Sequence, residues 1–150
     1  MVRIPPAIEV LLNVPKCHID ALLAPGHVCT ITGLREYEAL VAKYQIPIIV
    51  TGFEPVDLIQ GIYEAVRQLE RREVCLNNQY SRAVDYNGNE SAQLVINEVF
   101  DITERLWRGL GNIKNSGYTL KEKYKHYDAE NCFNIALRSE EHTSELRHRL

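Results

Sequence analysis

The sequence predicts an α/β fold, a parallel sheet of βαβ units flanked by helices, and three observations lead to this class. Short apolar runs rich in β-branched residues alternate with longer segments whose apolar residues recur at the helical period. Prolines and glycines stand between the two kinds of segment. Strands and helices that alternate in this way favour right-handed crossover connections and a parallel sheet covered on both faces.

The N-terminal part predicts one helix and one strand. Two prolines open a segment whose apolar residues keep the helical period until about Asn13, and these residues are Pro5, Pro6, Ile8, Leu11 and Leu12. A brief apolar run from Ile19 to Ala24 follows, and Pro25-Gly26 closes it. Turn residues at that point are typical of the end of a buried strand.

The next two elements continue the alternation. A stripe made of Leu34, Tyr37, Leu40, Val41 and Tyr44 predicts a helix that packs on the sheet. The run from Ile46 to Val50 is apolar on successive residues, which is the pattern of a strand covered on both faces. We expect this second strand to lie parallel to the first.

Pro55 begins the next expected helix, which ends in a solvated charged run at residues 70–73. Its apolar residues keep the 3.6-residue period, and they are Val56, Ile59, Ile62, Tyr63, Val66 and Leu69. A short strand within 74–84, a turn at 87–89, an amphipathic helix at 92–100 and a returning strand at 107–113 follow. These elements complete an α/β domain predicted to span residues 1–133.

The C-terminal end breaks the pattern. Residues 138–146 have no apolar face and resemble the translation of a sequencing adapter. Residues 134–150 are therefore expected to be a disordered or artefactual tail, and a genuine polar tail is the alternative.

Bulk composition narrows the classes of function. The 17 basic and 20 acidic residues are spread along the chain and give a net charge of -3, which argues against a nucleic-acid partner. The longest apolar runs fall far short of the ~20 residues that cross a bilayer, and a signal-peptide core is absent. We therefore expect a cytoplasmic protein without a membrane partner.

The cysteines do not predict a metal site. Cys17, Cys29, Cys75 and Cys132 lie far apart, and the sequence has no C-x-x-C pair and no histidine at zinc-finger spacing. Each is expected to be a small buried or half-buried apolar residue in a reducing compartment. No nucleophile elbow, P-loop, H-E-x-x-H or EF-hand motif occurs in the sequence either.

Two loops at the expected carboxyl ends of the strands present titratable residues. The first, at 24–27, ends in His27, and the second, at 52–55, contains Glu54. Ligands of open parallel sheets bind at this edge, so His27 and Glu54 on neighbouring strands would share a rim and form an acid/base or orienting pair. A cap or another structural role is the alternative for each, and for Asp57 the competing role is to complement the positive end of a helix.

Two further segments combine aromatic and polar residues. Residues 78–82 join hydrogen-bonding side chains with Arg82, and residues 107–111 hold a glycine pair without the complete dinucleotide fingerprint. Either segment is a candidate for the lining of a cleft. For Tyr80 and Trp107 the alternative is core packing with a polar tip at the surface.

Four motifs in order carry a resemblance to a known family. They are Leu23-Ala-Pro-Gly-His-Val28, the stretch from Ile46 to Asp57, Asn78-Gln-Tyr-Ser-Arg-Ala-Val84 and Trp107-Arg-Gly-Leu-Gly111. On these residues the chain resembles the HypD family of hydrogenase maturation factors, from about Arg3 to Phe133. The resemblance implies one of the two similar α/β domains of a three-part scaffold whose C-terminal domain carries a [4Fe-4S] cluster.

The resemblance also implies partners and a cargo. With a HypC-like partner the family holds iron bearing cyanide and carbon monoxide, the Fe(CN)2(CO) centre. Cyanide arrives through a HypE-like protein, and the finished centre passes to the hydrogenase large subunit. The family's N-terminal cysteine motifs and its cluster domain are absent from this fragment, so no cofactor is expected in the fragment itself.

The site residues that the resemblance implies form a cleft wall. They are His27, Glu54, Pro55, Asp57 and Arg82, which would orient ligands and hold a partner while thiolates elsewhere bind the iron. No catalytic and no metal-ligating residue is expected, and the fragment is predicted to be an assembly scaffold more than a classical enzyme. The alternatives are a stand-alone small-molecule enzyme with His27 and Glu54 as acid/base pair, and a truncated product without activity.

Overall fold

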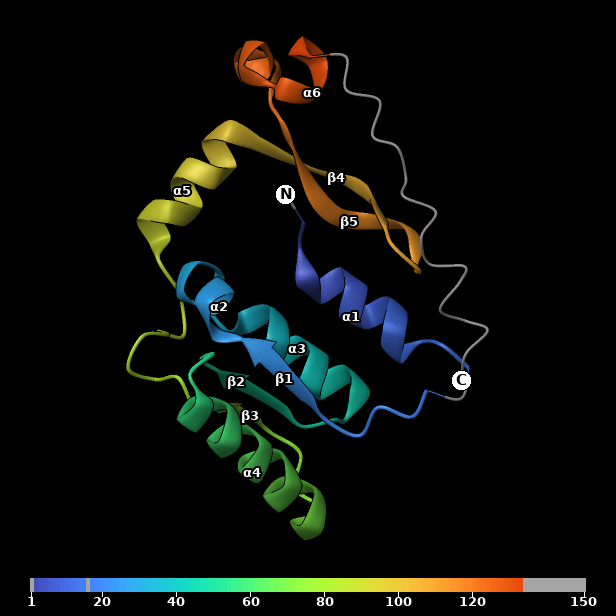
Figure 1. The fold of residues 1–150 in the computed structure, drawn as a ribbon, viewed down its shortest axis with the longest axis vertical. Coiled ribbons are helices and arrows are strands. Elements are labelled where there is room, and N and C mark those ends of the chain that lie inside the picture. Colours follow the sequence, from blue (N-terminus) through green and yellow to red (C-terminus); the bar gives the residue numbers. More distant parts are fainter. Residues whose placement is uncertain (1, 16, 134–150) are drawn as a thin grey trace. The chain divides into compact units, whose positions relative to one another are not determined.

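The structure, a computed structural model, describes residues 2–15 and 17–133 of the 150-residue chain. The chain divides into two compact units, Met1–Thr119 and Leu120–Leu150 (Figure 1). The expected tail at 134–150 lies outside the described residues, and the domain boundary at residue 133 stays a prediction.

A parallel sheet forms the centre of the first unit. In the described residues its strands are β1 (Leu22–Pro25), β2 (Ile48–Thr51) and β3 (Leu76–Asn78), in the order β1-β2-β3. The pairs Leu22 with Ile48 and Val50 with Asn78 fix a parallel register on both sides of β2. All four residues of β2 are buried, because strands flank it on both sides and helices cover both its faces. The predicted α/β class and the parallel pairing are confirmed.

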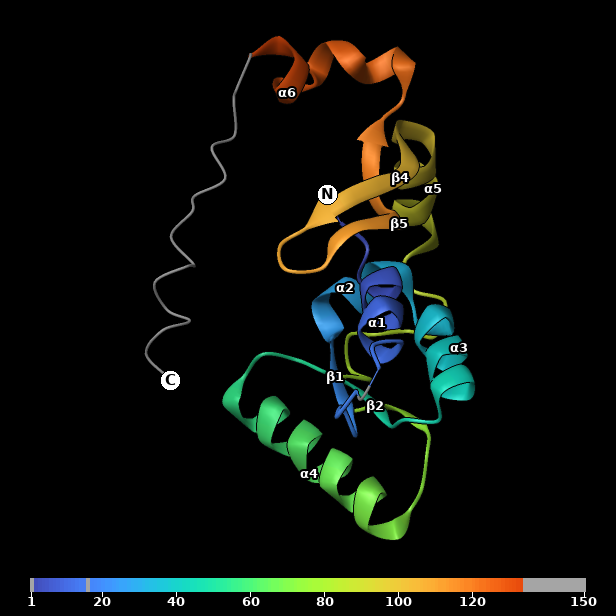
Figure 2. The ribbon, with the colours of Figure 1, turned by 90° about the vertical axis from the view of Figure 1, so that its right-hand side faces the viewer.

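Helices cover both faces of this sheet. The helices α1 (Ile4–Leu12) and α3 (Arg35–Tyr44) lie on one side and α4 (Pro55–Arg71) on the other (Figures 1 and 2). The main core lies on the side of α1 and α3, where Tyr37, Leu40 and Val41 pack against Ile48 and Val50. All three helices were predicted, with their starts within a few residues of the observed ones.

The chain between β1 and α3 differs from the prediction. A loop was expected at residues 24–27, but β1 runs directly into the helix α2 (Gly26–Thr32), so His27 lies in a first helical turn. Residues 26–32 carry too few apolar side chains at helical spacing to predict a helix. Strand β1 also begins at Leu22, later than the predicted Ile19.

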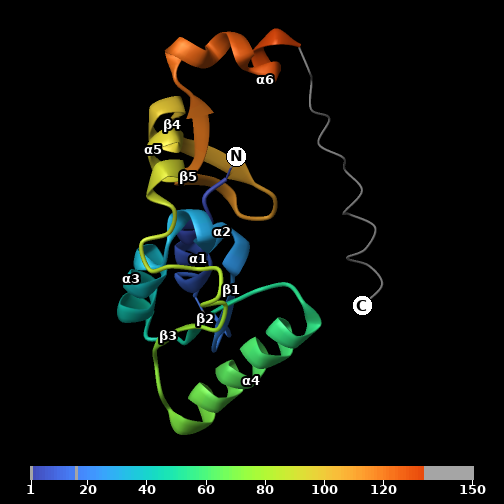
Figure 3. The same cartoon turned by 90° about the vertical axis from the view of Figure 1, so that its left-hand side faces the viewer.

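The helix α4 has an unusual orientation. Its buried residues are Asp57, Gly61 and Gln68, whereas the apolar residues that gave it its period are exposed. We call this exposed set the apolar face of α4, and it consists of Val56, Ile59, Ile62, Tyr63, Val66 and Leu69. Figure 3 shows α4 against the strands on one side and apart from the other helices of its unit.

The remainder of the first unit follows β3 through a turn at Gly88, whose φ is +69°. It contains α5 (Glu90–Val99) and a separate two-stranded sheet of β4 (Phe100–Trp107) and β5 (Gly111–Leu120). The helix was predicted, but the strand expected at 107–113 is wrong. Gly109 and Gly111 have φ values of +80° and +78° and form the turn between β4 and β5, a backbone conformation that glycine adopts without strain.

The described part of the second unit is helical. It contains a 3-10 helix at Glu122–Tyr127 and the short α6 (Ala129–Cys132). Across the residues that the structure describes, no helix combines the length and the hydrophobicity that a membrane span requires.

Candidate functional site

Three parallel strands deliver the candidate residues to one edge of the sheet. His27 lies two residues beyond the end of β1, Glu54 three residues beyond β2 and Arg82 four residues beyond β3. Because the strands are parallel neighbours, their carboxyl ends lie at the same edge, the usual ligand-binding edge of an open α/β sheet. We call these residues, with Asp57, the strand-end site.

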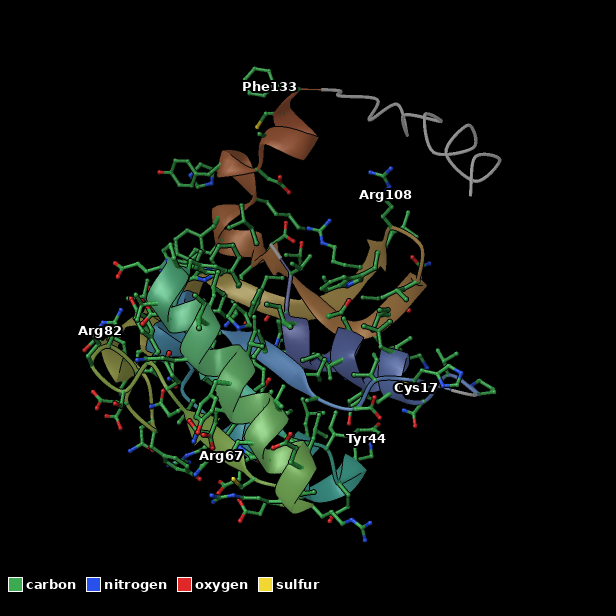
Figure 4. All side chains as sticks on the ribbon, turned by 60° about the horizontal axis from the view of Figure 1, so that its bottom comes forward. Cys17, Tyr44, Arg67, Arg82, Arg108 and Phe133 are labelled. Carbon is green, nitrogen blue, oxygen red and sulfur yellow. The ribbon has the colours of Figure 1, made fainter. Side chains whose placement is uncertain are left out.

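An ion pair between the buried Asp57 and the half-exposed Arg82, which Figure 4 labels, forms the centre of the strand-end site. The Arg82 guanidinium donates two hydrogen bonds to Asp57, from Nη1 to Oδ1 at 2.7 Å and from Nη2 to Oδ2 at 2.6 Å. Asp57 is 3% exposed, and Gln79 Nε2 donates to the same carboxylate at 3.4 Å. The hydrogen bonds from Arg82 hold the pKa of Asp57 below its ordinary value, and Asp57 raises the pKa of Arg82. Such a bidentate pair fixes the plane of the guanidinium as well as its position.

Glu54 lies on the solvent side of this pair. It is the residue immediately before α4, its side chain is 80% exposed, and its Oε2 lies 3.8 Å from Arg82 Nη2. Pro55 follows as the first residue of α4. Proline is well tolerated there, because an N–H at the first helical position would have no intrahelical acceptor. Glu54 is therefore an exposed carboxylate beside a cation that a second, buried carboxylate already holds.

His27 lies in different surroundings. Its ring is tilted against that of Phe53, with 4.8 Å between the ring centroids. It also lines a cavity of about 320 Å³ whose other walls include Arg3, Val28, Tyr37 and residues of α5 and β5. Among the described residues, no hydrogen bond joins His27 to Glu54. The hypothesis that the two form an acid/base pair therefore has no direct contact to support it.

Two glycines and Tyr80 pack together at this edge, a contact that the sequence motifs did not predict. A Cβ atom at Gly26 would lie 2.6 Å from Tyr80 Cδ1, and one at Gly52 would lie 2.8 Å from Tyr80 Cε2 and 2.2 Å from Asp57 Oδ2. The Tyr80 ring thus packs against the backbone at the ends of both β1 and β2. Arg82 covers that ring at 4.4 Å from its centroid, in a cation–π contact. The signal in the sequence that could have predicted this close packing is the glycine directly after β1 and the glycine directly after β2.

The segment at 107–111 does not belong to the strand-end site. Trp107 ends β4, and its Nε1 donates to the hydroxyl of the buried Ser116 on β5 at 2.8 Å. The motif therefore stabilises a β-hairpin, which agrees with the packing alternative for Trp107.

The cysteines do not fit a resident metal or cluster. All four are free, and Cys29 is buried and Cys17 half-buried as expected, but Cys75 and Cys132 are exposed. Burial raises the pKa of the Cys29 thiol to about 11. Within residues 2–15 and 17–133, no three His, Cys, Asp or Glu side chains gather closely enough to hold a metal ion. A metal centre formed from this part of the chain alone therefore has no support.

Comparison with known proteins decides the family. The family model for HypD, described as the hydrogenase formation hypA family, matches residues 1–148. The chain belongs to the HypD family. The resemblance carried by the four sequence motifs is thereby confirmed.

Curated relatives agree with this assignment. A putative hydrogenase expression/formation protein of Methanocaldococcus jannaschii is 46% identical over 124 residues, which cover 83% of this chain and 34% of the relative. Hydrogenase maturation factor HypD1 of Bradyrhizobium diazoefficiens is 41% identical over 138 residues, which cover 87% of this chain and 36% of the relative. Hydrogenase maturation factor HypD of Escherichia coli is 41% identical over 132 residues, which cover 87% of this chain and 35% of the relative. The chain spans about a third of the length of these curated relatives.

Proposed function

We propose that this chain forms one wall of a cleft in a hydrogenase maturation scaffold, on which an iron centre is assembled before transfer to the enzyme. The observation that carries the proposal is the strand-end site, where Arg82 is clamped by Asp57 beside the exposed Glu54. Membership of the HypD family supports the maturation role. Within that family, we infer that the scaffold is the HypC–HypD platform and that the cargo is the Fe(CN)2(CO) unit.

The residues of this chain would act around the cargo and not on the iron itself. An iron atom that carries cyanide and carbon monoxide calls for soft thiolate ligands, and the thiols of this chain do not fit that task. Cyanide nitrogens accept hydrogen bonds, and the five N–H groups of a guanidinium outnumber the two that Arg82 gives to Asp57. The role of Asp57 is then to hold Arg82 in one orientation.

His27 and Glu54 would extend the same wall. The imidazole of His27 presents a ring N–H next to the cavity of about 320 Å³. Glu54 is exposed and carries a charge that a basic group on a HypC-like or HypE-like partner would recognise. The [4Fe-4S] cluster of the proposed full-length scaffold would lie in another part of the protein, and the hydrogenase large subunit would receive the cargo in the cytoplasm.

The proposal is testable in a chimera of the Escherichia coli relative in which this chain replaces the matching third. The chimera is expressed in cells that lack their own HypD, and hydrogenase activity is measured by viologen reduction. Replacing Arg82 with Lys keeps the charge but removes the bidentate geometry, so maturation is expected to fall by about ten-fold or more. Glu54→Gln is expected to lower retention of the HypC-like partner in pull-downs.

Arg71→Lys is the matched control, because Arg71 is an exposed residue in the last turn of α4. Full maturation with Arg82→Lys in an active chimera would show that the clamp serves only the fold. An active chimera that binds its partner equally well with Glu54→Gln would remove Glu54 from the proposed wall.

A further inference from the structure

Tyr80 lies where the three parallel strands of the first unit end. It follows β3 by two residues, and its backbone N–H donates to the Val50 carbonyl of β2 at 3.2 Å. Its ring packs against the hydrophobic core and against Gly26 and Gly52, the residues that directly follow β1 and β2. Each strand therefore contributes to the placement of this ring.

The chain after Tyr80 returns over the same ring and carries Arg82 with it. The Tyr80 carbonyl accepts hydrogen bonds from the N–H groups of Ala83 at 3.0 Å and Val84 at 3.1 Å, which close a tight turn. Val84 is buried, and its carbonyl accepts from Asn78 Nδ2 at 2.8 Å, so the far end of the turn is anchored as well. Within this turn, Cζ of Arg82 lies 4.4 Å from the centroid of the Tyr80 ring.

Asp57 alone cannot fix the orientation of this guanidinium. Its two hydrogen bonds hold one edge of Arg82, but the last side-chain torsion of an aspartate is broad, so the ion pair could swing as a unit. The Arg82 side chain is 53% exposed, which leaves room for that motion on the solvent side. The Tyr80 ring covers one face of the guanidinium and blocks the swing in that direction.

We propose that Tyr80 is the positioning residue of the strand-end site: its ring holds the face of the Arg82 guanidinium while Asp57 holds its edge, so that the remaining N–H groups keep one direction. The contacts come from ring carbons and the ring face, so phenylalanine should replace the tyrosine. What those N–H groups bind rests on the proposed function, whereas the positioning concerns this chain alone.

The order parameter of the Arg82 Nε–H bond, measured by ¹⁵N relaxation on the full 150-residue chain, tests the proposal. We expect a value near that of rigid backbone, about 0.85, in the parent and in Tyr80→Phe. Tyr80→Leu has no flat face to cover the guanidinium, so the value should fall below about 0.6, the range of flexible groups. If Tyr80→Leu does not fold, Tyr80→Met takes its place, because methionine fills irregular gaps without a flat face.

Tyr44→Leu is the matched control. Tyr44 is half-buried like Tyr80 and packs against the same core, but it lies on α3, away from Arg82 (Figure 4). Loss of a packed ring should destabilise both variants, whereas only the change at Tyr80 should release Arg82. An order parameter that Tyr80→Leu leaves unchanged, or that Tyr44→Leu lowers equally, would overturn the proposal.

Hydrogenase maturation in the chimera separates this inference from the proposed function. Tyr80→Phe should support maturation as the parent chimera does, and Tyr80→Leu should lower it by about ten-fold or more, the range for residues that orient the groups around a metal centre. If the order parameter falls but maturation does not, Tyr80 still positions Arg82, and the proposed maturation role of the site is wrong instead.

Discussion

A single methyl group at Gly52 probes the packing that places the strand-end site. Its Cβ would lie 2.2 Å from Asp57 Oδ2 and 2.8 Å from Tyr80 Cε2, whereas ordinary van der Waals contact begins at 3.4 Å. Asp57 or the backbone must therefore shift by roughly 1 Å, the difference between these distances. Two hydrogen bonds hold Asp57 on Arg82, so its carboxylate is not free to move. The Tyr80 ring is not free to move either, because it also packs against Gly26.

Overpacking of this kind costs about 1–3 kcal/mol of the free energy of unfolding. For a chain of this length, each kcal/mol lowers Tm by about 2–4 °C, so Gly52→Ala is expected to lower Tm by roughly 2–12 °C. Thermal unfolding followed by circular dichroism measures the change. NMR titration of the Asp57 carboxyl should show its pKa moving up toward the ordinary value, because the contact with Arg82 is disturbed.

Gly61→Ala is the control, since Gly61 also packs against the end of β2. Its Cβ would lie 3.2 to 3.4 Å from atoms of the Thr51 side chain, a tight but adjustable contact. Alanine in a helix interior gains about 1 kcal/mol over glycine, which offsets the strain, so this variant should remain close to the parent. If Gly52→Ala melts at the parent's Tm and leaves the pKa of Asp57 unchanged, the steric reasoning is refuted.

Three further predictions concern buried polar groups. Because Arg82 holds the pKa of Asp57 low, that pair stabilises the fold above the unfolded-state pKa and loses its contribution as pH falls through the folded value. Urea unfolding of Asp57→Asn should therefore depend less on pH below about 4 than that of the parent, and equal slopes would contradict the assignment. At pH 8, iodoacetamide should label the exposed Cys75 well before Cys29, whose thiol is buried with a pKa of about 11, as followed by mass spectrometry. Gln68→Leu removes the acceptor of the Cys75 N–H and should lower the free energy of unfolding by about 1–3 kcal/mol, whereas an unchanged urea midpoint would show that water replaces it.

Much of the fold was readable because burial leaves a simple pattern in the sequence. The unbroken apolar run up to Val50 predicted a strand covered on both faces, and β2 is buried along its whole length. The proline at 55 and the period after it predicted α4 nearly to the residue. In β2 the local sequence and the tertiary environment favour the same structure, whereas in α4 the apolar period predicted the helix although its apolar residues are exposed.

The sequence did not predict helix α2, and it wrongly predicted a strand at 107–113. Helix α2 is short, and its turn between Gly26 and Thr32 carries too weak an apolar period to be distinguished from a loop. The strand expected at 107–113 contained Trp107 and Ile113, which favour strands, but the glycines between them form a tight turn. The aromatic residue therefore belongs to the end of one strand and the isoleucine to the start of the next.

The strand-end site was predictable only as far as topology determines it. That His27 and Glu54 follow neighbouring parallel strands could be inferred from the apolar runs before them. The clamp between Asp57 and Arg82 joins residues 25 positions apart, and its geometry depends on the path of the chain after β3. No local pattern in the sequence contains that information.

The orientation of α4 links the site to the exposed surface. Asp57, Gly61, Glu64 and Gln68 are spaced so that they lie along one stripe of the helix, and this polar stripe, not the apolar one, faces the sheet. The first turn must face inward for Asp57 to reach Arg82, and a rigid helix then carries the rest of the stripe with it. The apolar residues are left on the outside as a consequence. A change that turned the apolar face of α4 toward the sheet would gain hydrophobic burial but would break the clamp, so the same helix cannot both satisfy its own amphipathic pattern and hold Arg82 in place.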